Sequence, residues 1–358
     1  MEKVVEVSVE GKPFHVGKVY GEKAKELISK NIETYRTIFL KKYGLGWEKL
    51  VEKAYEGLEE VSSFNYDAVE FMKGIAEGAG IPFDDVLVLN YRYEIIFSER
   101  SSCTSIGFTN RGETFIAQNW DLYAGIEANV VNLRYKVNGG PTVFTQVEAG
   151  GLTHRGLNSE GIGLCINALR SKEDGGKLGI PVITVLGWSI LNCKRFSKIF
   201  ELVKDAKRNS SINFLLAKKD FIVDLELTPK DFEYIEADDN GIIVHTNHFI
   251  SDRFRGLNAC LKGLSGDTFV REIRAKQLIR KLNNTLNIEN VKEIFRDHFD
   301  YPSSICRHID EPGDYNTISK IKTLGSTIFE TCKNICHYTI GNPCKGQLPT
   351  DKIRGLEA

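Results

Sequence analysis

The chain has 358 residues, of which 42% are hydrophobic, and a formal net charge of −1, which is typical of one large globular domain or two intimate ones. Nearly balanced charge without a basic stripe gives no electrostatic basis for binding nucleic acid. The sequence has no apolar run as long as a membrane helix, and its charged N-terminus differs from a secretory signal. We therefore expect a cytoplasmic protein that binds neither nucleic acid nor membranes.

The first hundred residues have the apolar spacing of amphipathic helices. Apolar residues at i, i+3 and i+4 predict helices over 23–42, 47–61 and 66–79, followed by a short helix over 84–92. From Cys103 onward the hydrophobic period changes to two, which predicts β-strands. The predicted strands span 103–109, 114–120, 129–137, 142–148, 152–157 and 162–167.

The second half of the chain repeats this alternation of helices and strands. Helices are predicted over 181–192 and 196–207, strands over 211–218, 221–227, 232–236 and 242–246, helices over 267–282 and 290–298, and a hairpin over 326–332 and 335–340. Consecutive strands joined by short turns favour antiparallel sheets. The order therefore fits an α+β protein built as a four-layer αββα sandwich.

Eight cysteines are spread widely along the chain, which favours free thiols over a disulfide framework. Cys332, Cys336, His337 and Cys344 lie close together in the sequence. However, Cys332 and Cys336 flank the turn of the predicted hairpin, and no pair of cysteines has the CxxC spacing of zinc sites. We therefore expect no metal site.

Polar residues interrupt otherwise apolar strands in four places, beginning at Cys103, Gln118, His245 and Ser303. Each has an ordinary structural explanation: a buried strand cysteine, a turn aspartate, a surface loop and a solvated arginine. A hairpin turn between 103–109 and 114–120 would place Asp121 near Cys103. If the chain were cut before Cys103, that residue would carry both a thiol and its own basic amine.

Histidines offer a second interpretation of Cys103. His245, His248 and His308 would allow a cysteine–histidine thiol protease. The sequence around Cys103 does not resemble papain, and no glycine-rich oxyanion signature follows it. This interpretation is therefore weaker than that of a nucleophile at a new chain end.

Taken together, short segments along nearly the whole chain resemble the acyl-coenzyme A:6-aminopenicillanic acid acyltransferase family (peptidase C45), which belongs to the N-terminal-nucleophile (Ntn) hydrolases. The matching segments are 11–17, 74–78, 88–92, 103–104, 118–121, 148–150, 156–161, 167–169, 244–248, 301–302, 304–307 and 325–329. Each is weak alone, but their order and spacing over 300 residues make coincidence very unlikely.

The resemblance implies an Ntn-hydrolase αββα fold and self-cleavage between Ser102 and Cys103. Its products would be a helical N-terminal α-chain, 1–102, and a catalytic β-chain, 103–358, which stay associated as one intimate domain. Cys103 would be the nucleophile both for this cleavage and for catalysis. Ser102 stands where the fungal enzyme has glycine, and both residues are small.

The resemblance also implies roles for five other residues. Asp121 matches the acid near the new amino terminus, and Asn247 matches the side chain of the oxyanion hole. Arg307 and Ser304 match residues that line the substrate end of the site. Thr228 stands where the fungal enzyme has a serine, which implies a further substrate contact.

The expected function is that of an amidohydrolase or acyltransferase that acts on a small N-acyl compound through a cysteine acyl-enzyme. The substrate would be a small amide or thioester. No cofactor is expected, although by family analogy acyl-coenzyme A can serve as the acyl donor. Two alternatives stay open: a hydrolase of β-alanyl or other aminoacyl amines in the same family, and a non-catalytic binding protein with an uncleaved chain.

Overall fold

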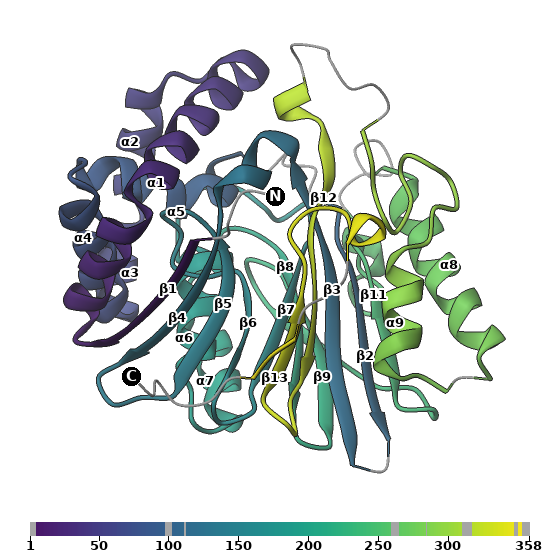
Figure 1. Ribbon diagram of the computed structural model, residues 1–358. Helices are drawn as coiled ribbons and strands as arrows, with labels where there is room; N and C mark the ends of the chain where they lie inside the picture. Colours follow the sequence, from purple (N-terminus) through teal and green to yellow (C-terminus); the bar gives the residue numbers. More distant parts are fainter. Residues whose placement is uncertain are drawn as a thin grey trace.

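The computed structural model describes residues 5–96, 102–110, 112–258, 265–283, 285–309, 317–346 and 350–352. Within these residues, two β-sheets lie face to face between two layers of helices (Figure 1). The strand order is β1-β4-β5-β6-β7-β8-β9-β10 in the larger sheet and β11-β2-β3-β12-β13-β14 in the smaller one. The αββα sandwich expected from the sequence is therefore confirmed.

The bounds of the elements follow the chain. The strands are β1 Val5–Gly11, β2 Thr104–Asn110, β3 Glu113–Tyr123, β4 Val130–Val137, β5 Thr142–Glu148, β6 Arg155–Asn158, β7 Gly163–Ala168, β8 Ile212–Lys218, β9 Phe221–Leu227, β10 Phe232–Glu236, β11 Ile242–His245, β12 Ile321–Glu330, β13 Ile335–Tyr338 and β14 Thr350–Lys352. The α-helices are α1 Pro13–Tyr43, α2 Trp47–Tyr55, α3 Leu58–Phe64, α4 Tyr66–Ala79, α5 Phe83–Ile96, α6 Gly187–Leu191, α7 Ser197–Asp205, α8 Asp267–Lys281 and α9 Ile288–Phe295.

Separate apolar clusters hold the four layers together. Ile116, Leu215 and Phe329 belong to the cluster between the two sheets. A second cluster joins the outer face of the smaller sheet to α8 and α9, and a third, larger one joins the helices α1–α7 to the larger sheet. Because the central strands are covered on both faces, β3, β5 and β8 are buried over almost their whole length, as expected for strands between two layers.

Helices α1 and α4 cross with their backbones in contact through reciprocal glycines. Gly17 and Gly21 of α1 face Gly74 and Gly78 of α4. A Cβ atom added to Gly78 would lie 2.0 Å from the carbonyl oxygen of Lys18, far inside van der Waals contact. This crossing therefore requires residues without side chains at these positions.

The structure departs from the predicted elements where tertiary contacts decide. Helix α1 begins at Pro13, ten residues before the predicted start, because the glycine-rich first turns are stabilised by packing on α4. The predicted helix 47–61 is interrupted at Gly57, where any Cβ would lie 2.3 Å from the hydroxyl of Tyr91. Strands β1 and β14 were not predicted, and β1 pairs in parallel with β4 although antiparallel pairing was expected.

The N-terminal segment is integrated with the rest of the chain. It was expected to be helical, yet it also supplies β1 as an edge strand beside β4. Side chains from both parts form one hydrophobic cluster, so 5–96 cannot be a separate folding unit. No helix in the described ranges carries an apolar stretch of the length needed to cross a bilayer.

Candidate active site

Cys103 lies immediately before β2, at the end of the strand where polar residues from several elements converge. Strand β2 pairs with β3 on one side and with β11 on the other. The β2–β3 hairpin brings Asp121 beside Cys103, and the backbone N–H of Asp121 donates to the Cys103 sulfur. Only 2% of Cys103 is exposed, so the thiol lies inside the protein rather than on its surface.

The backbone of Cys103 is held on both sides. Its N–H donates to Oδ1 of Asn247 at 2.7 Å, and its carbonyl oxygen accepts from Nη1 of Arg271 at 2.5 Å. Nδ2 of Asn247 donates to the carbonyl oxygen of Ala168 at 3.0 Å, which fixes the orientation of this amide. Nη2 of Arg271 also donates to Oδ1 of Asn247 at 3.1 Å. The peptide that joins Ser102 to Cys103 therefore ends in a rigid, hydrogen-bonded cradle.

Two acids and two arginines form a buried charge cluster around this cradle. Asp267 accepts from Nε of Arg271 at 3.1 Å, from Nη2 of Arg307, and from the hydroxyl of Ser102 at 3.1 Å. Nε of Arg307 also lies 3.7 Å from Oδ2 of Asp121. The four charges sum to zero, which limits the cost of removing them from water.

Burial sets the protonation of the two reactive groups. It raises the pKa of Asp121 to about 7 against the opposing charges of Arg307 and Arg271. Burial, together with the charge of Asp121, raises the pKa of the Cys103 thiol to about 12. Oδ1 of Asp121 accepts from Thr323 at 2.7 Å, while Oδ2 has no hydrogen-bond partner among the described residues. Asp121 can therefore accept a proton near neutral pH, and the thiol needs a base to react.

A small cavity of about 10 Å³, with room for about one water molecule, adjoins Cys103. It is lined by Arg92, Tyr93, Cys103, Trp120, Leu122, Glu148, His154, Ile166, Ala168 and Ile183. The two charged side chains of this lining are paired with each other, since Arg92 forms an ion pair with Glu148. Tyr35 also donates a hydrogen bond to Glu148 at 2.5 Å. The remaining wall is mainly apolar, but in the continuous chain the cavity is too small to hold an organic group.

His154 is an additional polar group of this cavity. Its ring packs at a tilt of 36° against Trp120, with a centroid distance of 4.7 Å, and its Nδ1 has no partner in the described structure. Burial and the nearby charges of Arg155 and Arg92 hold the pKa of His154 well below its usual value. The ring is therefore neutral and can donate or accept one hydrogen bond.

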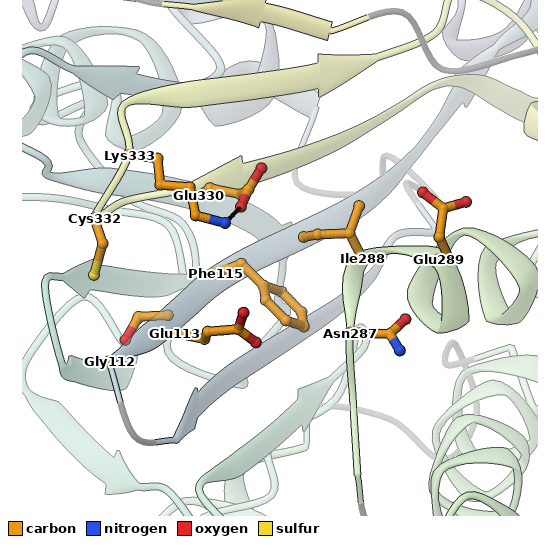
Figure 2. A pocket seen from close by; sticks show the side chains of 10 residues that line it. Gly112, Glu113, Phe115, Asn287, Ile288, Glu289, Glu330, Cys332 and Lys333 are labelled. Atoms are coloured by element: carbon orange, nitrogen blue, oxygen red, sulfur yellow. Dashed lines mark hydrogen bonds and ion pairs between the residues drawn. The ribbon is translucent and has the colours of Figure 1, made fainter.

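A larger hollow lies at the other end of the β2–β3 hairpin, against the start of α9. Figure 2 shows its lining, which includes Phe115, Ile288 and the ion pair between Glu330 and Lys333 at 2.6 Å. Its volume is about 230 Å³. The seven residues of β2 separate it from Cys103, a span of roughly 20 Å at the rise of a β-strand. Its size therefore says nothing about the chemistry at Cys103.

The two remaining residues expected at the substrate end lie in local turns. The hydroxyl of Ser304 donates to the carbonyl oxygen of Cys306 at 2.6 Å, which shapes the loop that carries Arg307. The hydroxyl of Thr228 accepts from the backbone N–H of Asp231 at 3.1 Å, in the turn after β9. None of the hydrogen bonds of the described residues joins Thr228 or Ser304 to Cys103.

The histidines considered as partners of Cys103 are bound elsewhere. Nε2 of His245 lies 2.9 Å from Glu226; burial lowers its pKa, but the charges of Asp224 and Glu226 outweigh burial and raise it to about 9. Nε2 of His248 lies 3.1 Å from Glu272. His308 faces His298. The cysteine–histidine interpretation therefore has no support at these positions.

Sequence reasoning missed Asp267 and Arg271, although a signal was present. They lie at i and i+4 on α8, on the same buried stripe as Ala275 and Ile279. Two opposite charges on the apolar face of an amphipathic helix predict a buried ion pair. Nothing in the sequence indicated that this pair would meet Cys103, because α8 lies more than 160 positions further along the chain.

The αββα sandwich therefore places the buried thiol of Cys103 where the side chains of Asn247 and Arg271 converge. The chain belongs to the acyl-coenzyme A:6-aminopenicillanic acid acyl-transferase family, whose model matches residues 108–345. This confirms the resemblance found in the sequence.

The chain is also similar to one relative and to two proteins of solved structure. The acyl-coenzyme A:6-aminopenicillanic-acid-acyltransferase 40 kDa form of Emericella nidulans is 26% identical over 330 residues, covering 91% of this chain and 88% of the relative. A variant of conjugated bile acid hydrolase from Clostridium perfringens covers 70% of this chain and 97% of its own, with 15% identity and a TM-score of 0.44. Penicillin V acylase from Agrobacterium tumefaciens covers 66% and 83%, with 12% identity and a TM-score of 0.42. Similarity at these TM-scores bears on neither the substrate nor the site.

Proposed function

We propose that this protein is a cysteine amidohydrolase or acyltransferase that cleaves its own chain between Ser102 and Cys103 and then uses Cys103 as its nucleophile. The observation that carries the proposal is the cradle of Cys103, in which Asn247 holds the backbone nitrogen and Arg271 holds the carbonyl oxygen. The backbone groups of any buried residue need hydrogen-bond partners, but here side chains from distant elements supply them rather than a neighbouring strand. Such side chains can fix the position of a nitrogen that is to become a catalytic amine, and that position decides whether it can act as a base.

The residues around Cys103 can support the cleavage step. The thiol proton passes to Oδ2 of Asp121, which has no hydrogen-bond partner among the described residues. The sulfur attacks the carbonyl carbon of Ser102, the C–N bond breaks as the nitrogen of Cys103 takes up a proton, and a thioester remains. Water then hydrolyses the thioester, leaving the carboxylate of Ser102 and the free α-amine and thiol of Cys103. Atoms and charge balance without any cofactor.

The same residues can support turnover in the cleaved enzyme. Oδ1 of Asn247, now 2.7 Å from the backbone nitrogen, would hold the new α-amine. An α-amine has a reference pKa of about 7.7–8.0, so a useful fraction is neutral at physiological pH and can accept the thiol proton. Nδ2 of Asn247 donates one hydrogen to Ala168 and retains a second one for the oxyanion of the acyl intermediate. Asp121 would stabilise the ammonium form of the amine.

The substrate is proposed to be a small N-acyl compound whose acyl group would lie beside Cys103. The cavity there holds about one water molecule in the continuous chain, so binding would require its wall to open. The names of the family and of the fungal relative contain both acyl-coenzyme A and 6-aminopenicillanic acid. For this chain, a thioester such as acyl-coenzyme A is a candidate acyl donor, and water or an amine takes the acyl group from the enzyme. In the continuous chain the Arg307 side chain is paired with Asp267 and Asp121. To bind a substrate, as proposed, this side chain would first have to move away from these acids.

Intact-mass spectrometry of purified wild type and Cys103→Ala tests the proposal. Wild type should give two associated chains of roughly 11 and 29 kDa by residue share, and Cys103→Ala a single chain of 40.3 kDa. Cys332→Ser, which removes an exposed thiol far from the cradle, should cleave like wild type. A wild-type chain that stays whole, with Cys103 resistant to iodoacetamide in peptide mapping, would instead indicate a non-catalytic binding protein.

A further inference from the structure

A cluster of four potential metal ligands lies next to the loop that carries Arg307. His298, Cys306, His308 and Cys344 each direct one ligand atom into a common space, and these four atoms lie within 4.8 Å of one another. Sequence analysis did not group them. Of the four residues it considered as ligands, only Cys344 is present, since Cys332 is exposed and His337 pairs with Glu330.

The distances within this cluster match those around a tetrahedral zinc ion. Nε2 of His298 lies 3.1 Å from Nε2 of His308, and the sulfurs of Cys306 and Cys344 each lie 3.5 Å from that same nitrogen. Zn–N bonds of about 2.0–2.1 Å and Zn–S bonds of about 2.3 Å place tetrahedral ligands about 3.3 Å apart for two nitrogens and about 3.6 Å for nitrogen and sulfur. We propose that His298, Cys306, His308 and Cys344 form a zinc site.

The donor set favours zinc over other cations. Two thiolates and two imidazoles are soft and borderline ligands that bind zinc in structural sites and that calcium or magnesium would not select. Two thiolates also neutralise the charge of the divalent ion, so the nearby Lys345 does not oppose binding. Because four protein side chains complete the coordination, the site leaves no open position and is structural rather than catalytic.

Hydrogen bonds to sulfur prepare the cluster for a metal. Nδ2 of Asn342 donates to the sulfur of Cys306 at 3.6 Å, and the backbone N–H of Cys344 donates to the same sulfur. Such bonds stabilise a thiolate and orient it toward the ion. His298 is exposed, so a path from solvent to the cluster exists.

The position of the cluster suggests what the zinc ion stabilises. Cys306 and His308 flank Arg307, whose side chain leaves the cluster and reaches Asp267 and Asp121. The carbonyl oxygen of Arg307 accepts from Nδ2 of Asn342 at 2.7 Å, two residues before Cys344. A zinc ion would tie the loop over 297–308 to the turn Pro343–Lys345 and so fix the arginine that faces the buried acids.

Two readouts that do not depend on enzymatic activity test this inference. The purified full chain, reduced and incubated with zinc sulfate, should retain about one zinc ion per chain after desalting, as measured by elemental mass spectrometry. Cobalt(II) should produce the visible absorption of tetrahedral thiolate coordination. Cys103→Ala should bind zinc equally well, so the result does not depend on chain cleavage.

Variants identify the ligands. Cys344→Ser and His298→Ala should each lower the affinity for zinc by about 100-fold or more and abolish the increase in melting temperature that zinc gives to wild type. His298 is exposed, so His298→Ala keeps the fold. Matched controls are Cys332→Ser and His15→Ala, which replace an exposed cysteine and an exposed histidine outside the cluster.

Three results would overturn the zinc site. The first is a wild-type chain that retains less than about a tenth of an equivalent of zinc. The second is unchanged zinc binding in Cys344→Ser or His298→Ala. The third is a disulfide between Cys306 and Cys344 in protein purified without oxidant, because the two sulfurs would then be bonded to each other and could not bind a metal as thiolates.

Discussion

Replacing Arg271 by lysine tests whether the cradle of Cys103 is required for chain cleavage. Arg271 is 1% exposed, and its guanidinium binds the carbonyl oxygen of Cys103, Oγ1 of Thr104, Oδ1 of Asn247 and the carboxylate of Asp267. Lysine keeps the charge but concentrates its donors on one nitrogen, which cannot span these four acceptors. The variant therefore removes the fixation of Cys103 while leaving Asp267 an ionic partner.

The expected magnitude follows from the bonds lost. A hydrogen bond to a charged group contributes about 1.5–3 kcal/mol. If the bond to the carbonyl oxygen of Cys103 aligns the peptide for attack, its loss should slow cleavage roughly 10- to 150-fold, since each 1.36 kcal/mol is a factor of ten. The free energy of unfolding should fall by about 1–3 kcal/mol. The larger loss of about 3–5 kcal/mol expected for an unpaired buried charge should not occur, because the ammonium group remains beside Asp267.

Cell-free synthesis followed by gel electrophoresis over time measures the rate of cleavage directly. Arg208→Lys is the matched control, because Arg208 is also buried and also binds several acceptors, the carbonyl oxygens of Val203, Ala206, Thr228 and Asp231. It should lose comparable stability and cleave at the wild-type rate. The reasoning fails if folded Arg271→Lys cleaves as fast as wild type, or if Arg208→Lys is slowed to the same degree.

Two further predictions concern protonation and packing. Wild-type cleavage should accelerate as pH rises through about 7, where burial places the pKa of Asp121. Asp121→Asn should slow cleavage by about 100-fold and remove this increase with pH. An increase that persists in the variant would assign the base to another group. Because folded Asp121 retains its proton above the ordinary pKa of 3.8, wild-type stability should fall relative to that of Asp121→Asn as pH increases toward about 7, as urea unfolding would measure. Gly78→Ala should lower the free energy of unfolding by about 1–3 kcal/mol despite the better helix propensity of alanine, because its Cβ would lie 2.0 Å from the carbonyl oxygen of Lys18. Gly46→Ala, with no atom within 4 Å of the new Cβ, should change it by less than about 0.5 kcal/mol, and equal effects of the two substitutions would contradict the packing argument.

Local patterns were sufficient to predict most elements, and long-range packing explains the exceptions. Strands such as β2 and β3 show an alternating pattern and a short turn, so their pairing follows from neighbouring residues. Helix α1 starts early because Gly17 and Gly21 pack on α4, a contact that helix propensity cannot reveal. Strand β1 is followed by helix α1 and pairs with β4 more than a hundred residues later, so no local turn indicated it.

In the candidate site too, some residues could be predicted from local sequence and others depend on long-range packing. Cys103 and Asp121 are joined by one hairpin, so the sequence alone predicted that they would meet. Asn247 came from the family resemblance, and its hydrogen bond to Cys103 bridges 144 positions. Arg271 and the cluster around His308 come from helices and loops whose relative positions depend on the whole fold. Residue types and spacing could therefore suggest the nucleophile but not its cradle or the metal ligands.

The buried charges suggest why a single bond break would activate the protein. In the continuous chain, Asp121 and Asp267 balance Arg271 and Arg307, and burial keeps the Cys103 thiol protonated, with a pKa of about 12. Under our proposal, cleavage adds an amine that is positively charged when protonated, next to the sulfur and within the field of Asp121. This charge would lower the pKa of the thiol and that of Asp121, since an opposite charge favours each ionised form. The same nitrogen that was held as an amide by Asn247 would then regulate the sulfur. On this proposal, the precursor would stay unreactive toward outside substrates until the peptide had been cut.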